Sequence, residues 1–221
     1  MPANASEWDA RHREAAEKAL EEPANIVLEW LPLLPEGPAL DLACGRGRHT
    51  LLLAAHGHAV TAVDWSEAAL EILEAQAHAK KLEVGRPVVL GSAGVAAAYQ
   101  RGIHPVQANL EDIRLPDSAF AVIVCVQYLQ RPLFPQMERA LRPGGVLLFE
   151  TFTHAQLEYS GGPRNPAYLL EPEELRTAFP RLEVLFYREL NAGQGIASLV
   201  GRRPMSVNRD ANCAAPSDRA L

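Results

Sequence analysis

The chain has little of what marks secreted, membrane or nucleic-acid-binding proteins. Its 221 residues include three cysteines, which form no CxxC pair and have no metal-type spacing with histidine. The first residues carry no apolar h-region, and no apolar run approaches the length of a membrane span. The net charge of −6 is not the basic balance typical of DNA- and RNA-binding domains. We therefore expect a cytoplasmic protein with no secretion signal, no bound metal, and no nucleic-acid or membrane partner.

What is present is an ordinary globular composition, with 48% hydrophobic and 22% charged residues. This length suits one sizeable α/β domain and is short for two. We expect an N-terminal helical cap over residues 1–37, a main domain over 38–203, and a disordered polar tail over 204–221. Within the main domain, we interpret residues 82–104 as an insertion with a short strand and a short helix.

The most informative stretch is residues 38–73. A short apolar run ends in a turn that contains Gly45 and Gly47, a helical pattern follows, and a second apolar run ends at Asp64. Strand, glycine turn, helix, strand and acid form the first half of a nucleotide-binding βαβ unit. The glycines let the backbone approach a ligand closely. Asp64, at the end of the second strand, is placed to accept hydrogen bonds from a ribose diol.

Two details of this stretch argue against a dinucleotide. A Rossmann motif has a third glycine three residues after Gly47, where this chain has Thr50. The first strand also carries Asp41, whose carboxylate would repel a pyrophosphate and attract a cation. S-adenosylmethionine is a nucleoside with a sulfonium, an ammonium and no phosphate, so it fits this pattern better.

Residues 41–47, DLACGRG, resemble the first motif of the class I S-adenosylmethionine-dependent methyltransferases, with Ala43 in place of the family's first glycine. The Pro-Gly-Gly turn at 143–145 is similar to the family's turn before the fifth strand, and residues 128–135 and 150–152 resemble small bacterial members of the tellurite-resistance type. The resemblance implies an α/β, doubly wound, mostly parallel seven-stranded Rossmann-like sheet. The last strand is then antiparallel, and helices precede the sheet.

Candidate site residues follow from the strand ends and from the resemblance. Cys44, Cys125 and Val126 are expected to contribute backbone contacts. Trp65, beside Asp64, is expected to cover the adenine face, and Asn109 and Leu110 lie where the family binds adenine. The predicted cofactor-binding residues are Asp41, Ala43, Cys44, Gly45, Gly47, Asp64, Trp65, Asn109, Leu110, Cys125 and Val126. Substrate-binding candidates are Tyr128, Arg131, His154 and Tyr159.

The predicted reaction is direct in-line methyl transfer from S-adenosylmethionine to a small-molecule acceptor. No general base is identifiable, so the catalytic residues are not predicted. Related small methyltransferases often begin with tryptophan followed by Arg-Tyr, whereas this chain has Trp8 and then Arg11-His12. An NAD(P)-dependent oxidoreductase and a non-catalytic cofactor-binding or partner module stay open as alternatives. The sequence predicts neither the acceptor nor the oligomeric state.

Overall fold

Seven strands form one sheet in the order β5-β2-β1-β6-β7-β9-β8. The computed structural model describes residues 4–86, 89–90, 94–95 and 100–205. The strands of the sheet are β1 (Ala39–Leu42), β2 (Ala59–Asp64), β5 (Gly102–Gln107), β6 (Phe120–Val126), β7 (Leu141–Phe152), β8 (Glu183–Asn191) and β9 (Gly195–Arg202). The first five strands in this order, β5, β2, β1, β6 and β7, are parallel to one another. Strand β9 runs antiparallel to both of its neighbours, β7 and β8. The predicted fold class is confirmed.

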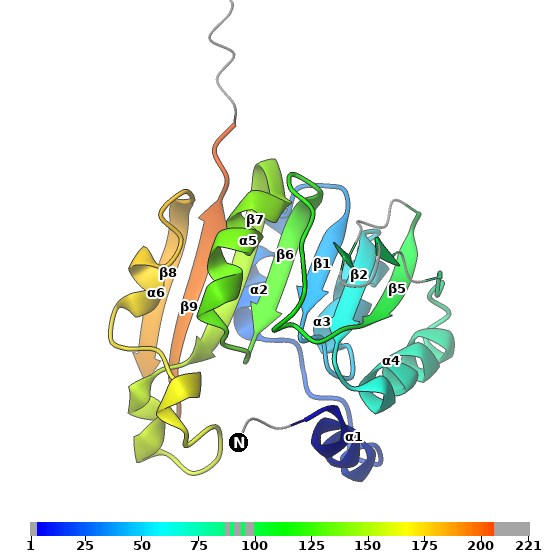
Figure 1. The fold of residues 1–221 in the computed structure, drawn as a ribbon, viewed down its shortest axis with the longest axis horizontal. Coiled ribbons are helices and arrows are strands. Elements are labelled where there is room, and N and C mark those ends of the chain that lie inside the picture. The colour runs from blue at the N-terminus through cyan, green and yellow to red at the C-terminus, as the bar shows by residue number, and fades with distance from the viewer. Residues whose placement is uncertain (1–3, 87–88, 91–93, 96–99, 206–221) are drawn as a thin grey trace, which may run out of the picture.

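Helices cover both faces of the sheet (Figure 1). The α-helices are α1 (Ala5–Glu14), α2 (Asn25–Trp30), α3 (Arg48–Ala55), α4 (Glu67–Ala79), α5 (Phe134–Ala140) and α6 (Glu174–Thr177). Short 3₁₀ helices are η1 (Leu31–Leu33), η2 (Arg131–Leu133), η3 (His154–Glu158) and η4 (Pro166–Tyr168). The apolar contacts place α2, α3 and α4 on one face and α5 and α6 on the other. No helix in the described ranges is long and apolar enough to cross a membrane.

The central strands are buried on both faces, as a continuous apolar run predicts. All seven residues of β6 are buried, and so are all four of β1. An aromatic cluster of Phe134, Phe149 and Phe179 packs α5 against β7, with an edge-on contact of 5.4 Å between the first two ring centroids. This rigid centre holds the carboxyl ends of β1, β2 and β6 in fixed positions relative to one another.

Some local expectations were wrong or lie outside the described residues. The described part of the insertion 82–104 contains β3 (Val89–Leu90) paired antiparallel with β4 (Gly94–Val95), and no helix. Its residues 87–88, 91–93 and 96–99 are not described, and neither are residues 206–221 of the predicted tail.

Gly47 is required by packing as well as by backbone geometry. Its φ is +87°, and an added Cβ would lie 2.1 Å from Cδ1 of Leu73 on α4. We expect Gly47→Ala to lower the free energy of unfolding by about 2–4 kcal/mol, from left-handed strain plus overpacking. Urea denaturation measures the loss. Gly193→Ala is the matched control, because its φ is +77° and nothing lies within 4 Å of its added Cβ. Equal losses in the two variants would contradict the packing role.

Candidate functional site

The turn after β1 combines several residues in the left-handed region. Ala43, Gly45 and Gly47 have φ angles of +54°, +52° and +87°. The Cys44 N–H donates to the Val63 carbonyl at 3.0 Å, which ties the turn to the end of β2. Left-handed backbone costs a residue with a Cβ about 1–2 kcal/mol. Such strain gathers at functional sites, where the surrounding structure holds it in place.

Ala43→Gly tests whether this strain is real. Glycine adopts a positive φ without the clash of a Cβ, so we expect the free energy of unfolding to rise by about 1 kcal/mol. Guanidinium denaturation measures the change. A loss of stability instead would show that the Ala43 methyl group stabilises more by packing than the turn loses by strain.

Asp64 joins the turn after β1 to the start of α4. One of its carboxylate oxygens, Oδ2, accepts the Gly45 N–H at 2.8 Å, and the other, Oδ1, accepts the Ser66 N–H at 2.9 Å. The residue is 9% exposed, at the carboxyl end of β2. A carboxylate oxygen has two lone pairs, so each can accept a second hydrogen bond. Asp64 is therefore oriented by the backbone and still able to bind a diol.

Asp41 lies beneath the turn. It is 1% exposed, and the Thr50 hydroxyl donates to its Oδ2 at 2.6 Å. Burial raises the pKa of Asp41 to about 7, against the lowering effect of the Thr50 hydrogen bond, and the charge of Asp64 adds to the rise. A cation bound above the turn would favour the ionised form of this carboxyl group.

The N-terminal segment, residues 4–24, lies across the carboxyl edge of the sheet (Figure 1, dark blue α1). Asp9 of α1 caps α4, because its Oδ1 accepts from the Ser66 hydroxyl at 2.6 Å and the Ala68 N–H at 3.1 Å. Arg46 of the glycine turn donates to the Ala15 and Lys18 carbonyls at 2.7 and 3.1 Å. The segment is thus attached by polar contacts to the turn itself.

His12 is the side chain of α1 that faces the glycine turn. Its Cε1 lies 3.6 Å from the position of a Cβ added to Gly45. Burial lowers the pKa of His12, the charge of Asp64 opposes that effect, and Arg46 adds to it. The imidazole is therefore mostly neutral at neutral pH, and it covers the backbone of Gly45.

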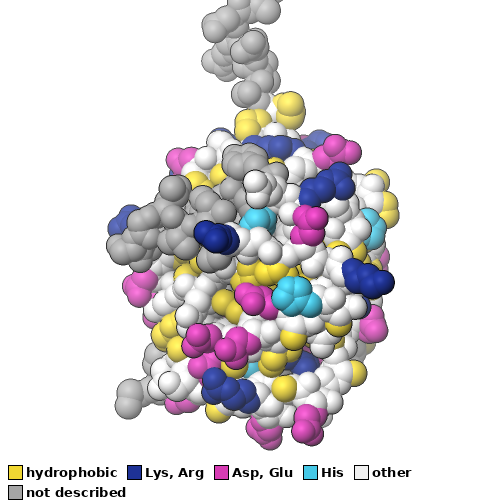
Figure 2. All heavy atoms as spheres, turned by 90° about the vertical axis from the view of Figure 1, so that its right-hand side faces the viewer, with side chains coloured by type: hydrophobic (Ala, Val, Ile, Leu, Met, Phe, Trp, Pro, Cys, Tyr) yellow, Lys and Arg dark blue, Asp and Glu magenta, His cyan; other side chains and the backbone are white. Residues whose placement is uncertain are grey.

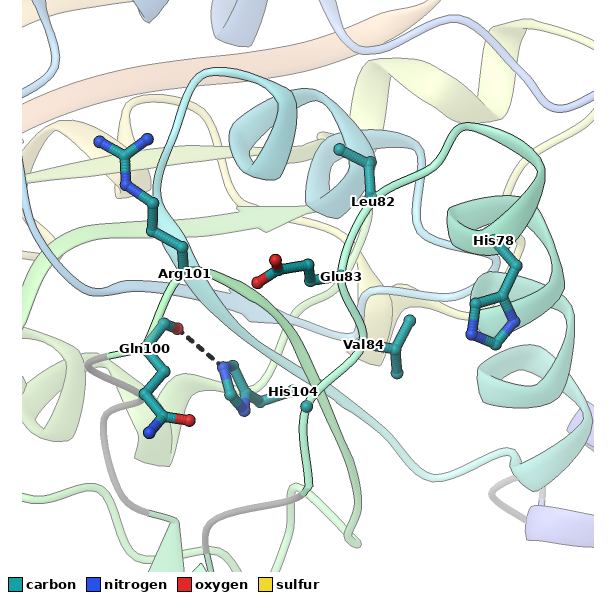
Figure 3. A pocket seen from close by; sticks show the side chains of 8 residues that line it. His78, Leu82, Glu83, Val84, Gln100, Arg101 and His104 are labelled. Atoms are coloured by element: carbon teal, nitrogen blue, oxygen red, sulfur yellow. Dashed lines mark hydrogen bonds between the residues drawn. The ribbon is translucent and has the colours of Figure 1, made fainter.

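Two hollows lie at the other end of the strands. One of about 450 Å³ is lined by Pro38, His58 and Ala59, before β1 and at the start of β2. The other, of about 520 Å³, lies beside the start of β5 (Figure 3). There the ring nitrogens of His104 face the Arg86 and Gln100 carbonyls at 3.0 and 2.9 Å. Ligands of open α/β sheets bind at the carboxyl ends of strands, so neither hollow is the predicted site.

A family model described as a methyltransferase domain matches residues 40–149, about half of the chain, and these residues contain the turn, Asp64 and β6. The chain belongs to the class I S-adenosylmethionine-dependent methyltransferases. S-adenosylmethionine is the cofactor of this family. The tellurite-resistance subtype stays a prediction.

Individual relatives agree with the family. The chain is 31% identical over 139 residues to the putative methyltransferase YqeM of Bacillus subtilis (strain 168), covering 58% of this chain and 48% of that protein. It is 28% identical over 138 residues to the malonyl-[acyl-carrier protein] O-methyltransferase of Herminiimonas arsenicoxydans, covering 61% and 44%. The chain thus spans less than half the length of these curated relatives. A solved S-adenosylmethionine-dependent methyltransferase from Methanosarcina mazei shares the fold, with a TM-score of 0.59 and 19% identity over 84% of this chain and 100% of that one.

The residues at the carboxyl edge fit the methyltransferase cofactor. An added Cβ on Gly45 would occupy the space between the turn and His12, which the glycine leaves clear. Asp64 offers acceptors for ribose hydroxyls, and a cationic ligand above the buried Asp41 would favour the ionised form of that carboxyl group. No observation at this edge conflicts with a nucleoside that carries a sulfonium.

The remaining predicted cofactor residues divide into backbone and side-chain candidates. Cys125 and Val126 are 0% and 6% exposed and pack in the core, so only their backbone is available. Leu110 is 4% exposed, and its side chain also packs in the core. The Asn109 side chain shapes its own turn, since it accepts the Glu111 N–H at 3.0 Å. Trp65 is half-buried beside Asp64. Contact of these residues with adenine or ammonium stays a prediction.

Tyr128 follows the carboxyl end of β6, two residues after Val126. Its hydroxyl donates to Oε1 of Gln130 at 2.6 Å. Burial raises the pKa of Tyr128, and the charges of Glu111 and Asp64 add to the rise. The phenol therefore stays protonated at neutral pH and is a hydrogen-bond donor rather than a base.

The other substrate candidates hold the segment that follows β7. Arg131 makes a bidentate pair with Glu174, with nitrogen–oxygen distances of 2.6 and 2.7 Å, and donates to the Leu169 carbonyl at 3.0 Å. His154 lies 3.3 Å from Glu171, and the Tyr159 hydroxyl donates to Asn191 at 3.0 Å. These contacts position the segment, and direct contact with a substrate stays a prediction.

Sequence reasoning missed Arg48 and Asp9 as members of this site. One signal was available for Arg48, which is the first residue of α3. A cation at a helix N-terminus opposes the helix dipole, so its presence there points to another role. Contacts of Asp9 with Ser66 and of Arg48 with Gln127 span 57 and 79 residues, which local patterns do not reveal.

Proposed function

We propose that the protein transfers a methyl group from S-adenosylmethionine to a small-molecule acceptor at the carboxyl edge of the sheet. The observation that carries the proposal is Asp64, whose two oxygens are fixed by the Gly45 and Ser66 N–H groups and keep lone pairs for a ribose. Asp41 beneath the turn supports a cationic ligand and disfavours a pyrophosphate.

When bound, S-adenosylmethionine supplies an electrophilic methyl group. Asp64 would hold the ribose, the backbone of residues 43–45 would line the methionine portion, and Trp65, Asn109 and Leu110 would border the adenine. The backbone of Cys125 and Val126 would hold the ammonium. In-line alignment of two bound reactants contributes on the order of 7–11 kcal/mol, so the reaction asks little of acid–base residues.

The N-terminal segment would exclude water from the cofactor. Asp9 fixes α1 on α4, and Arg46 fixes the end of the segment on the glycine turn. Exclusion of water protects the sulfonium and strengthens the electrostatic contacts of the closed site. On this basis residues 1–37 act as a cap on a domain of residues 38–203, and the polar residues 204–221 as a tail outside it. A cytoplasmic location stays a prediction from the cysteine usage.

Two alternatives make different predictions. An NAD(P)-dependent oxidoreductase needs room for a pyrophosphate, whereas Thr50 is buried at the third-glycine position and bonded to Asp41. A non-catalytic module would bind the cofactor and transfer nothing.

Figure 2 shows the β5 edge with basic, acidic and histidine side chains interspersed, so that face offers no uniform basic patch for a nucleic-acid acceptor.

The proposal is tested with methyl-labelled S-adenosylmethionine and a low-molecular-weight extract. We expect label to move into small molecules, and Asp64→Ala to stop the transfer. Label that moves only into protein or nucleic acid would overturn the small-molecule acceptor. Cofactor binding with no transfer would favour the non-catalytic module.

A further inference from the structure

Gln127 occupies a strained position directly after β6. Its φ is +60°, and its N–H donates to the Glu150 carbonyl at 2.7 Å. The neighbouring strand β1 is followed by Ala43, with φ +54°, so two residues with a Cβ are left-handed at adjacent strand ends. Glutamine gains nothing from this conformation. The strain therefore points to a use for the side chain that it aims.

The Gln127 side chain is held by Arg48. The Nη2 of Arg48 donates to Oε1 of Gln127 at 3.0 Å. The same guanidinium reaches the N-terminal segment, because its Nη1 donates to Oε2 of Glu21 at 2.7 Å and to the Glu22 carbonyl at 3.3 Å. The Arg48 side chain is 16% exposed. Arg48 thus connects the N-terminal segment to the end of β6.

A carboxamide held by its oxygen has a fixed amide nitrogen. The group is planar, so the contact of Oε1 with Arg48 also directs the two N–H donors of Nε2. Within the described part of the chain, this Nε2 has no hydrogen-bond acceptor, whereas Oε1 is occupied. The exposed Gln127 follows the central strand β6 at the carboxyl edge, on the side of Tyr128. Its donors are left for a group that enters the site.

We propose that Arg48 is a positioning residue that orients the Gln127 amide hydrogens toward an oxygen of the methyl acceptor while the N-terminal segment is in place. The inference rests on the proposed function and deepens it: the acceptor carries a carboxylate or hydroxyl oxygen beside the atom that receives the methyl group. The guanidinium of Arg48 thereby links the position of the N-terminal segment to recognition of the acceptor.

The link is tested by nuclear magnetic resonance on the full ¹⁵N-labelled chain with S-adenosylhomocysteine. Gln127→Glu assigns the Gln127 side-chain amide, and Gln194, exposed in the β8–β9 turn, is the solvent-exposed reference. We expect Arg48→Met and Glu21→Ala to lower the heteronuclear NOE of the Gln127 amide toward that of Gln194. Glu22→Ala is the matched control, because only its backbone carbonyl contacts Arg48.

If the heteronuclear NOE of the Gln127 amide were unchanged in folded Glu21→Ala and Arg48→Met, the proposed link between the N-terminal segment and Gln127 would be overturned. An equal change in Glu22→Ala would overturn it too, since the effect would then follow charge and not the contact.

In the labelled-methyl assay, Gln127→Glu keeps an oxygen for Arg48 and loses both donors. We expect at least a tenfold slower transfer and an affinity for S-adenosylhomocysteine within threefold of wild type.

Transfer at the wild-type rate by Gln127→Glu would overturn the acceptor contact. A wild-type protein that binds S-adenosylhomocysteine and transfers nothing would remove the acceptor contact together with the proposed function. The resonance experiment would still decide the link, because it needs no acceptor.

Discussion

Asp64→Ala abolishes measurable binding of S-adenosylhomocysteine, with a loss of at least about 100-fold in affinity. Hydrogen bonds to a charged group contribute about 1.5–3 kcal/mol each, and a ribose diol offers two. About 3 kcal/mol corresponds to about 100-fold in the dissociation constant. The substitution also frees the Gly45 and Ser66 N–H groups, so the glycine turn loses its anchor to α4. Titration calorimetry measures the change.

Two controls separate ligand binding from folding. Asp64→Asn keeps one oxygen for a backbone N–H and removes the charge, and we expect it to lose less affinity than Asp64→Ala. Asp117→Ala removes a carboxylate whose side chain is 72% exposed, and leaves binding unchanged. Circular dichroism confirms that each variant is folded. A folded Asp64→Ala that binds as tightly as wild type would remove Asp64 from the cofactor site.

Asp41→Asn flattens the pH dependence of stability between about pH 4 and 7. Burial raises the pKa of Asp41 from 3.8 to about 7, so the folded state holds a proton that the unfolded state releases within this range. A raised carboxyl pKa therefore stabilises the fold below about pH 4 relative to above pH 7, and stability falls as the pH rises through the range. Three pKa units correspond to about 4 kcal/mol, as an order of magnitude.

The gain from Asp41→Asn should appear only at high pH. Asparagine keeps an acceptor oxygen for the Thr50 hydroxyl and has no proton to lose. Urea denaturation of the ligand-free protein at pH 5 and pH 8 measures the difference between variant and wild type, with the exposed Asp117→Asn as the control. A difference that is the same at both pH values would show that Asp41 is ionised throughout the range.

The βαβ unit could be predicted because its signals are local. The apolar runs, the glycines and Asp64 follow one another within residues 38–73, and each reports the backbone at its own position. The buried strand β6 is predictable for the same reason, since its apolar run is continuous. The ribose role of Asp64 followed from its position at a strand end, whereas the adenine role of Asn109 and Leu110 came from the family resemblance.

Other features depend on contacts between distant residues. The helix α1 has no buried residue, so no apolar periodicity marks its end at Glu14. The guanidinium of Arg48, at the start of α3, contacts Glu21 of the N-terminal segment and Gln127 after β6. Arg131 was predicted beside the substrate, whereas its guanidinium pairs with Glu174. Pairings of this kind depend on the folded chain and have no one-dimensional pattern.

The most direct test is titration calorimetry of the wild-type protein with S-adenosylhomocysteine and, separately, with NADH. The site predicts saturable binding of S-adenosylhomocysteine, because Asp64 can accept from the ribose, whereas an ionised Asp41 would repel a pyrophosphate. NADH should give no heat beyond dilution. Binding of NADH, or of neither ligand, would contradict the assignment of this edge as a S-adenosylmethionine site.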